Sequence, residues 1–226
     1  ITGSQSLFGL KTKLQFGRTT ITGVLSQQKS TTSQIQVTGG AQTTEFDIYA
    51  DQYESNKHFF LAHYFKENYN TALANLPFVN SPINITQVEV WITNKTGMIE
   101  NSRNIISFLD LGESNITNIE NEDFTTCYPA FNYPDNEQSN DMYDRLITQY
   151  SGIRDINQVN NELSALAAIN FLGGKDYEKL ERARKLNESE YTIHPKLGYI
   201  SLNQALNNDE VLAVAFQYTI GNETYQ

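Results

Sequence analysis

Three histidines are the side chains of this sequence best suited to bind a metal or to transfer a proton near neutral pH. They are His58, His63 and His194. His58 and His63 fall in a stretch that we expect to be helical, where five residues turn the helix by about 500° and leave the two side chains roughly 140° apart. They therefore cannot chelate one ion as an i, i+4 pair can. His194 precedes Pro195 and is expected in a surface loop, so we predict no metal site and no cofactor.

The nucleophilic side chains lack a setting that would activate them. Cys127 is the single cysteine, so it has no partner for an internal disulfide. Its neighbours are acids and aromatic residues, whereas a reactive thiolate needs a basic group beside it. The chain has no G-x-S-x-G motif and no S-x-x-K with its companion motifs. Gly173, Gly174 and Lys175 lack the remaining residues of a phosphate loop and indicate the end of one helix and the start of another.

Carboxylates gather in two short groups, DLGES from Asp110 and ENED from Glu120. Neither group has the D-x-[DN]-x-[DN]-G spacing of a calcium loop. Hydrolysis by a pair of carboxylates stays open, because a sequence gives no distance between two acids. We rank such a hydrolase last and predict that the chain is not an enzyme.

Aromatic residues offer a second kind of site, a surface that stacks on sugars or on another protein. The stretch NITQVEVWITNKTG carries the only tryptophan, Trp91. Alternate side chains of a strand face opposite ways, so Trp91 lies on the polar face, away from Val88, Val90 and Ile92. The ring is either packed beneath a helix, which we favour, or exposed as a binding platform with Tyr128 and Tyr133. These two tyrosines and Trp91 are the candidate interaction surface.

Composition limits the class of partner. The net charge of −10 argues against nucleic acid, because binding phosphates requires a basic surface. No stretch approaches the roughly 18 consecutive apolar residues of a membrane helix. The many Asn, Thr and Gln residues are typical of an exported or cell-surface protein. The chain does not begin with Met and ends in the strand-like YTIGNETYQ, so we expect a piece of a longer protein.

The elements that must position these residues follow from hydrophobic periodicity. We predict polar strands over residues 1–45, a helix over 51–76, and strands at QVEVWIT and NIISFLDL. An irregular acidic stretch over 112–140 is followed by three predicted helices, the third of which begins at Asp176. YISLNQAL and EVLAVAFQYTI complete the chain as strands. Both parities of NIISFLDL are apolar, which predicts a strand covered on both faces. EVLAVAFQYTI is also apolar on both parities, which favours a central strand.

This order lacks the regular alternation of a doubly wound fold. It favours an α+β fold, in which about four helices cover a largely antiparallel sheet, with a β-rich N-terminal segment. We place a β-strand or hairpin segment at residues 1–45 and an α+β domain at residues 46–226.

Several long stretches resemble one family. They are TGGAQTTEFDIYADQYESNKHFF and the residues that follow it to Gly97, SRNIISFLDLGE, YDRLITQYSGIRDINQVNNELSAL, and NDEVLAVAFQYTI. Together they span most of residues 38–220. They resemble the SprA family, called Sov in some bacteria, of Bacteroidetes.

The resemblance implies a fragment of the outer-membrane translocon of the type IX secretion system. Such a protein is a very large β-barrel that passes folded cargo to the cell surface and supports gliding motility. Its implied partners are other type IX components and secreted cargo proteins. The segment would be a soluble part in the cell envelope, on either the periplasmic or the surface side, with residues 1–45 bordering the barrel. The family supplies no catalytic residue to transfer.

The sequence is therefore compatible with two functions. The first is a non-enzymatic structural module of a protein-export channel. The second is a cell-surface module that binds carbohydrate or protein in the manner of an adhesin, with Trp91, Tyr128 and Tyr133 as its platform.

Overall fold

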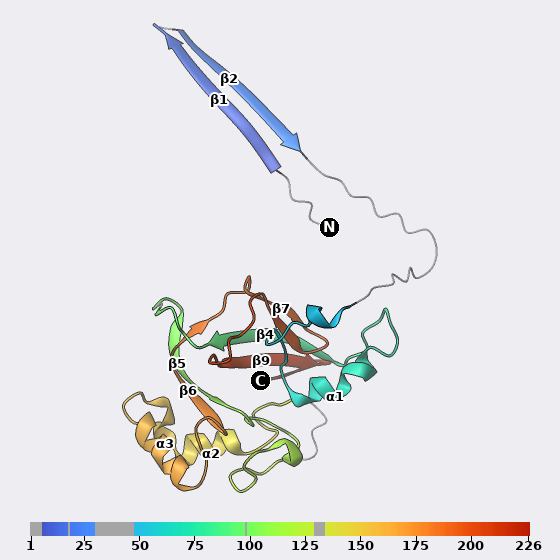
Figure 1. Ribbon diagram of the computed structural model, residues 1–226, viewed down its shortest axis with the longest axis vertical. Coiled ribbons are helices and arrows are strands. Elements are labelled where there is room, and N and C mark those ends of the chain that lie inside the picture. The colour runs from blue at the N-terminus through green and yellow to red at the C-terminus, as the bar shows by residue number, and fades with distance from the viewer. Residues whose placement is uncertain (1–5, 18, 30–47, 98, 129–133) are drawn as a thin grey trace. The chain divides into compact units, whose positions relative to one another are not determined.

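The computed structural model describes residues 6–17, 19–29, 48–97, 99–128 and 134–226. It divides into two compact units, Ile1–Tyr49 and Ala50–Gln226. In the first unit, β1 (Ser6–Phe16) and β2 (Thr19–Lys29) form an antiparallel hairpin that is paired from Ser6↔Lys29 to Phe16↔Thr19 (Figure 1).

The second unit is built on a five-stranded antiparallel sheet with the order β10-β9-β4-β6-β5 (Figure 1). Its strands are β4 (Ile83–Ile92), β5 (Ser102–Phe108), β6 (Tyr177–Lys185), β9 (Leu212–Ile220) and β10 (Glu223–Tyr225). The strands predicted at QVEVWIT and EVLAVAFQYTI are β4 and β9, and they pair along their whole length. Leu212, Val214 and Phe216 of β9 face the apolar layer on one side of the sheet, and Ala213 packs against Trp91 on the other, which explains why apolar residues occur on both parities of β9. The strand predicted at NIISFLDL is β5, which lies at the edge of the sheet and has no fully buried residue, so the prediction that both of its faces are covered was wrong.

One face of this sheet is covered by a second sheet and a helix. The second sheet has the order β3-β8-β7, formed by His58–Phe60, Tyr199–Leu202 and Tyr191–His194, and the helix is α1 (His63–Ala72). Two apolar clusters fill the layer between them and the five-stranded sheet. One contains Val90, Leu186, Ile200 and Leu202; the other contains Ala62, Phe65, Ile83, Ile85 and Tyr218.

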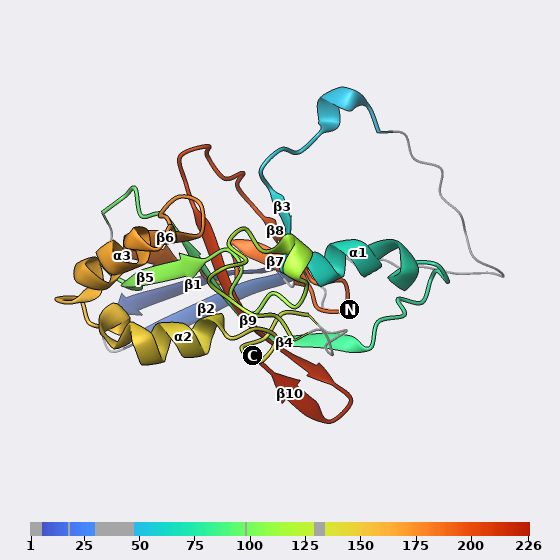
Figure 2. The same cartoon turned by 90° about the horizontal axis from the view of Figure 1, so that it is seen from below.

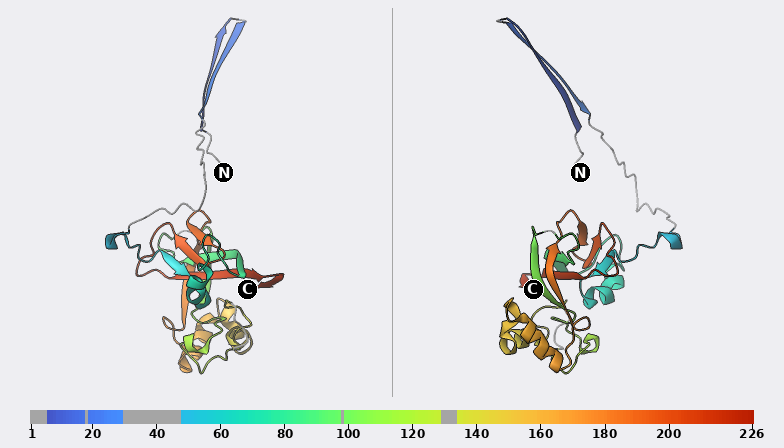
Figure 3. Two further views of the ribbon diagram at one scale, coloured as in Figure 1. Left: turned by 90° about the vertical axis from the view of Figure 1, so that its right-hand side faces the viewer. Right: turned by 60° about the vertical axis from the view of Figure 1, so that its left-hand side comes forward.

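Two further helices pack together, apart from α1, where β5 ends and β6 begins (Figure 3). They are α2 (Met142–Gln149) and α3 (Val159–Ala168). The apolar cluster around these helices contains the buried residues Phe124, Met142, Leu146, Val159, Leu163, Leu166 and Phe171. Ile106 and Phe108 of β5 and Tyr177 of β6 are partly buried and pack against it. Short 3-10 turns occupy Ala50–Gln52, Ile116–Asn118 and Ser151–Arg154. No helix in the described ranges is long and apolar enough to cross a membrane.

The prediction of about four helices was wrong for the helix expected from Asp176, because the residues from Tyr177 form strand β6. Leu180 and Ala183, spaced three apart as on a helix, are both buried. A β-bulge produces this spacing: Glu181 and Arg182 lie opposite Asn104 alone, because Arg103 pairs with Ala183 and Ile105 with Leu180. The extra residue returns the strand to the same face after three positions in place of two. The described residues therefore contain three α-helices.

The predicted helix over 51–76 was also too long. Its first part contains β3, which pairs with β8, and α1 begins only at His63. The pairing partner lies about 140 positions further along the chain, so local periodicity gives no sign of it.

Asn104 supports the bulge directly. Arg182 has a positive φ of 53°, and its backbone N–H donates to Asn104 Oδ1 at 2.8 Å. We expect Asn104→Ala to lower the free energy of unfolding by about 1 kcal/mol, the usual net value of one hydrogen bond. Asn104→Asp keeps an acceptor and serves as the control. Urea denaturation measures both variants, and equal losses from them would contradict a role for the acceptor.

Candidate interaction surface

Trp91 is buried in the sheet, with 8% of its surface exposed. It packs with Leu180, Ala183 and Ala213. The guanidinium carbon of Arg103 lies 5.2 Å from the ring centroid and Lys185 Nζ lies 5.7 Å from it. These are cation–π distances. The groups that cover the ring thus come from β5, β6 and β9 of its own sheet, where the sequence had suggested a helix.

An ion pair fixes one of these cations. Lys185 Nζ donates to Glu89 Oε1 at 2.5 Å. The hydrogen bond from Lys185 is the main influence that holds the pKa of the Glu89 carboxyl below its usual value, and the neighbouring Trp91 and Arg103 also lower it. Lys185 is therefore held beside Trp91 by a carboxylate of the same strand as the ring.

The two tyrosines of the candidate surface lie in the acidic stretch. Tyr128 is 45% exposed, and its backbone N–H donates to Ser139 O at 2.9 Å. Tyr133 lies outside the described residues. No contact among the described residues joins Tyr128 to Trp91. An interaction surface made of these three residues stays a prediction.

The histidines occupy positions that the sequence did not indicate. His58 is in β3 and not on the helix of His63; its ring nitrogens lie 2.7 Å from Ser201 Oγ and 2.8 Å from Glu54 Oε2. His194 ends β7 and is half-buried, not in a surface loop; it stacks on Tyr199 at 5.6 Å and its Nδ1 accepts from the Leu197 N–H. Within the described ranges, no three or more His, Cys, Asp or Glu residues are placed to hold a metal ion.

A buried polar cluster surrounds Asn140, and no sequence motif predicts it. Asp110 and Glu113 are each 4% exposed and Asn140 is 2% exposed. Asn140 Nδ2 donates to the backbone oxygens of Asp110 and Glu113 at 2.8 and 3.1 Å, and Cys127 Sγ donates to Glu113 O at 3.3 Å. One signal was present: no Lys or Arg occurs between Arg103 and Arg145. Asp110 and Glu113 therefore have no cation close by in sequence, and backbone N–H groups serve as their donors.

The carboxylates of the cluster accept such bonds. Asp110 Oδ2 accepts from the Glu120 N–H at 3.0 Å and Glu113 Oε1 from the Asn115 N–H at 2.9 Å. Burial, followed by the charge of Glu113, raises the pKa of the Cys127 thiol to about 11. The thiol is therefore protonated at neutral pH and is a poor nucleophile.

Asp135 lies near this cluster, and its carboxyl pKa is far from the usual value. The pKa of its carboxyl is raised to about 8, chiefly by burial and then by the charges of Glu113, Asp110 and Glu67, against a lowering backbone hydrogen bond from Ser114. Its Oδ1 is buried with no hydrogen-bond partner among the described residues. Because the folded pKa lies above that of the unfolded chain, stability falls as the pH rises from about 4 to about 8.

Asp135→Asn should remove this dependence. We expect the variant to gain stability over the unchanged chain as the pH rises from 5 to 8, by up to about 1.4 kcal/mol for each unit between the folded and unfolded pKa values. Urea denaturation at several pH values measures the difference. Asp209→Asn is a control, since Asp209 is exposed and its pKa is lowered, chiefly by Lys95. A difference between Asp135→Asn and the unchanged chain that stays constant with pH would contradict the expectation.

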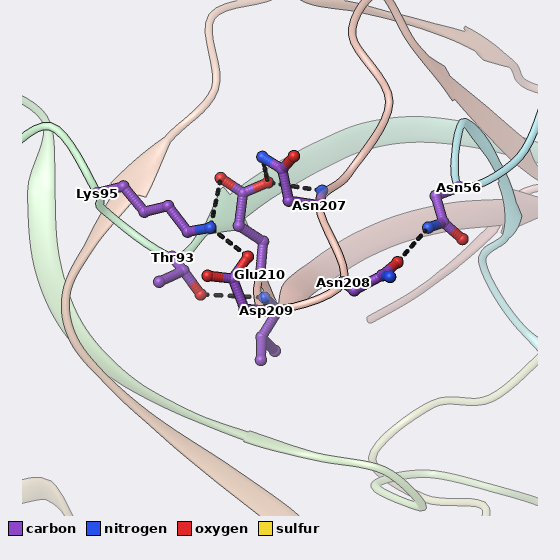
Figure 4. Close-up of polar contacts among 8 residues, drawn as sticks. Asn56, Thr93, Lys95, Asn207, Asn208, Asp209 and Glu210 are labelled. Carbon is purple, nitrogen blue, oxygen red and sulfur yellow. Dashed lines mark hydrogen bonds and ion pairs between the residues drawn. The ribbon is translucent and has the colours of Figure 1, made fainter.

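A polar clasp joins three loops at the start of β9 (Figure 4). Lys95 pairs with Asp209, and Glu210 Oε2 accepts from the backbone and side-chain nitrogens of Asn207 at 2.8 and 2.9 Å. Thr93 Oγ1 accepts from the Val211 N–H at 3.0 Å. Asn56 donates to Asn208 Oδ1 at 3.1 Å. The clasp fixes the end of β4 and the start of β9 relative to each other.

A small cavity of about 220 Å³ lies beside α1. Helix α1 forms one wall, and the segments before β4 and after β7 form the other. Its lining mixes aromatic and polar side chains: Tyr64, Phe65, Asn68, Tyr69, Thr71, Ala72, Asn80, Ser81, Pro82, Lys196 and Leu197. This volume lies below the roughly 300–1,000 Å³ of pockets for drug-sized ligands. The cavity suits a single sugar ring or one side chain of a peptide.

Comparison with known proteins identifies the family of the chain. A family model described as SprA_N, motility related/secretion protein, matches residues 2–208. No curated protein matches the chain. The match covers both described units and almost all of the elements above, and the family's description concerns motility and secretion. The chain therefore belongs to the SprA_N family of motility-related secretion proteins.

Proposed function

We propose that this chain is a non-enzymatic structural module of a very large outer-membrane channel, which exports folded proteins to the cell surface by type IX secretion and supports gliding motility. The family match over residues 2–208 carries the proposal. The expected location is the cell envelope, and the expected partners are other type IX components and secreted cargo.

The side chains that could bind or react are engaged within the fold, which supports a structural role. Trp91 is buried, the Cys127 thiol is protonated at neutral pH, and His58 and His194 are bonded within the fold. A passage for folded cargo must also be polar, since exposed apolar patches bind proteins nonspecifically. The net charge of −10 suits such a surface.

Deletion of residues 50–226 from the full-length protein in a gliding bacterium tests the proposal. We expect cargo proteins to disappear from the medium and colonies to stop spreading, while the shortened protein remains in the envelope fraction. Gly198→Ala, which strains the core, should reduce both outputs in part. Gly97→Ala, at a glycine with open space around it, is the matched control. Normal secretion and spreading after the deletion would refute the proposal.

A carbohydrate- or protein-binding module is the second candidate, favoured by the cavity beside α1. Glycan and peptide arrays with the 226-residue chain test it. Lys196 lines the cavity, whereas Lys66 is an exposed residue of α1 outside the lining. Binding that is lost in Lys196→Ala and kept in Lys66→Ala would support this candidate. An absence of binding on both arrays would count against it.

A further inference from the structure

The cavity beside α1 has a local charge opposite to that of the whole chain. Among the described residues that line it, Lys196 is the only charged one, whereas the net charge of the chain is −10. No charged residue occurs between Glu67 and Glu89, and this uncharged stretch supplies most of the other lining residues. Glu67 itself lies outside the lining, and its charge acts on Asp135. The cavity therefore presents a single positive group.

A tight turn between β7 and β8 carries Lys196 to the cavity. The Gly198 N–H donates to His194 O at 2.9 Å, and the Leu197 N–H donates to His194 Nδ1 at 3.2 Å. Gly198 lies directly against the ring of Phe65 in α1, and Figure 2 shows β7 and β8 beside this helix. No acid in the described ranges pairs with Lys196. Its charge is thus available to a ligand.

Other polar groups of the lining are also available. Asn68 donates from Nδ2 to Tyr64 O at 2.9 Å, which leaves its Oδ1 as a free acceptor. The side chains of Thr71 and Asn80 make no hydrogen bond within the part of the chain that the structure describes. The same holds for the hydroxyls of Tyr64 and Tyr69. These groups include both donors and acceptors, so they match a ligand with several hydroxyl groups.

A row of aromatic side chains continues from the cavity across the second sheet. Phe60, Tyr199 and His194 are neighbours in register on β3, β8 and β7. They lie on the face opposite Ile200, which is fully buried. Tyr69 of the cavity lining lies 5.5 Å from the ring of Phe60 and 6.5 Å from that of Tyr199. Because Phe60 is 41% exposed, this row offers an aromatic surface next to the cavity.

We propose that the cavity binds a sugar ring that carries a carboxylate, as one unit of an acidic oligosaccharide. The carboxylate pairs with Lys196 through a charge-assisted hydrogen bond. The hydroxyls of the ring bond to Asn68 and Asn80, and the apolar face of a neighbouring ring lies on Phe60. The inference names the ligand class for the second candidate function, the binding module, and rests on that candidate.

Two simpler ligands use the lining less completely. The acidic side chain of a peptide would bond to Lys196 but would leave the amides and hydroxyls around it without partners. A neutral sugar would bond to the amides and hydroxyls but would gain nothing from the charge of Lys196. An acidic sugar uses both kinds of group, and a single ring suits the small volume of about 220 Å³.

Two-dimensional NMR on the 226-residue chain tests the inference. The probes are three-ring oligosaccharides of galacturonic acid and of glucuronic acid, together with the methyl ester of each, which keeps the sugar and removes the charge. We expect at least one of the acids to shift the amide signals of Asn68, Asn80 and Leu197 until they saturate. The matching ester should bind about tenfold more weakly, the value of one hydrogen bond to a charged group.

Lysine variants identify the charged partner of the sugar. Lys196→Ala should weaken the binding of the acid about tenfold and leave the binding of the ester unchanged, whereas Lys196→Arg should keep most of the affinity. Lys66→Ala is the matched control, because Lys66 is an exposed residue of α1 outside the lining. It should bind both probes like the unchanged chain. The spectrum of each free variant checks that its fold is intact.

The outcomes separate this inference from the second candidate function. Equal binding of an acid and its ester at the cavity would overturn the inference and keep the candidate. So would an affinity for the acid that Lys196→Ala leaves unchanged. If none of the four probes gives saturable shifts, the inference also falls, and binding of neutral glycans or peptides on the arrays then decides the candidate separately. The proposal of a structural module is independent of all these results.

Discussion

Trp91→Ala is expected to lower the free energy of unfolding of the second unit by about 3–5 kcal/mol, the usual cost of removing a large buried aromatic side chain. Only 8% of the residue is exposed. The change would leave a cavity among Leu180, Ala183 and Ala213 and would uncover two cations that lie against the ring. Trp91 is the only tryptophan, so circular dichroism must follow the denaturation in place of fluorescence.

Two controls separate burial from the cation contacts. Tyr53 is 82% exposed, and Tyr53→Ala should change stability by no more than about 0.5 kcal/mol. Arg103→Ala should cost about 0.5–1 kcal/mol through the lost cation–π contact, and this cost should vanish when Trp91 is already alanine. A loss below about 1 kcal/mol for Trp91→Ala would mean that the ring is accessible, and would revive the platform interpretation.

Gly198→Ala is expected to have a similar cost, at about 2–6 kcal/mol. Gly198 has a φ of +62°, and a Cβ added there would lie 2.1 Å from ring atoms of Phe65. Phe65 is 3% exposed, so its ring has little room to move. A left-handed backbone at a non-glycine residue costs about 1–3 kcal/mol, and overpacking a core adds about 1–3 kcal/mol.

Gly97→Ala isolates the backbone contribution. Gly97 has a φ of +68°, but a Cβ added there would meet no atom within 4 Å, so the change should cost only the backbone part. Denaturation with urea compares the two variants. Adding Phe65→Leu should recover part of the loss in Gly198→Ala and none in Gly97→Ala. Equal losses at the two glycines would contradict the clash with Phe65.

Several features of the candidate site depend on contacts that form only in the folded sheet. The parity of the strand put Trp91 on the face opposite Val88 and Val90, but its cover of Arg103 and Lys185 comes from strands that join β4 only in the folded sheet. The position of β5 at the edge of the sheet was also hidden, because an edge is a property of the strand order and not of a segment. The buried acids Asp110 and Glu113 looked like loop residues, since their donors are backbone groups that no motif identifies.

The sequence by itself determined the strands with sustained apolar patterns, β4 and β9, and it determined the family through long stretches of specific order. Only the tertiary structure decided that the segments of β3 and β6 are strands. Residues 58–60 became a strand because β8 supplies the missing hydrogen bonds from far along the chain. The segment from Tyr177 became a strand because a bulge at Arg182 places Leu180 and Ala183 on one face. In both cases long-range backbone pairing overrode local periodicity, since a pattern of apolar residues records which side chains are buried and not which backbone groups satisfy the hydrogen bonds of the segment.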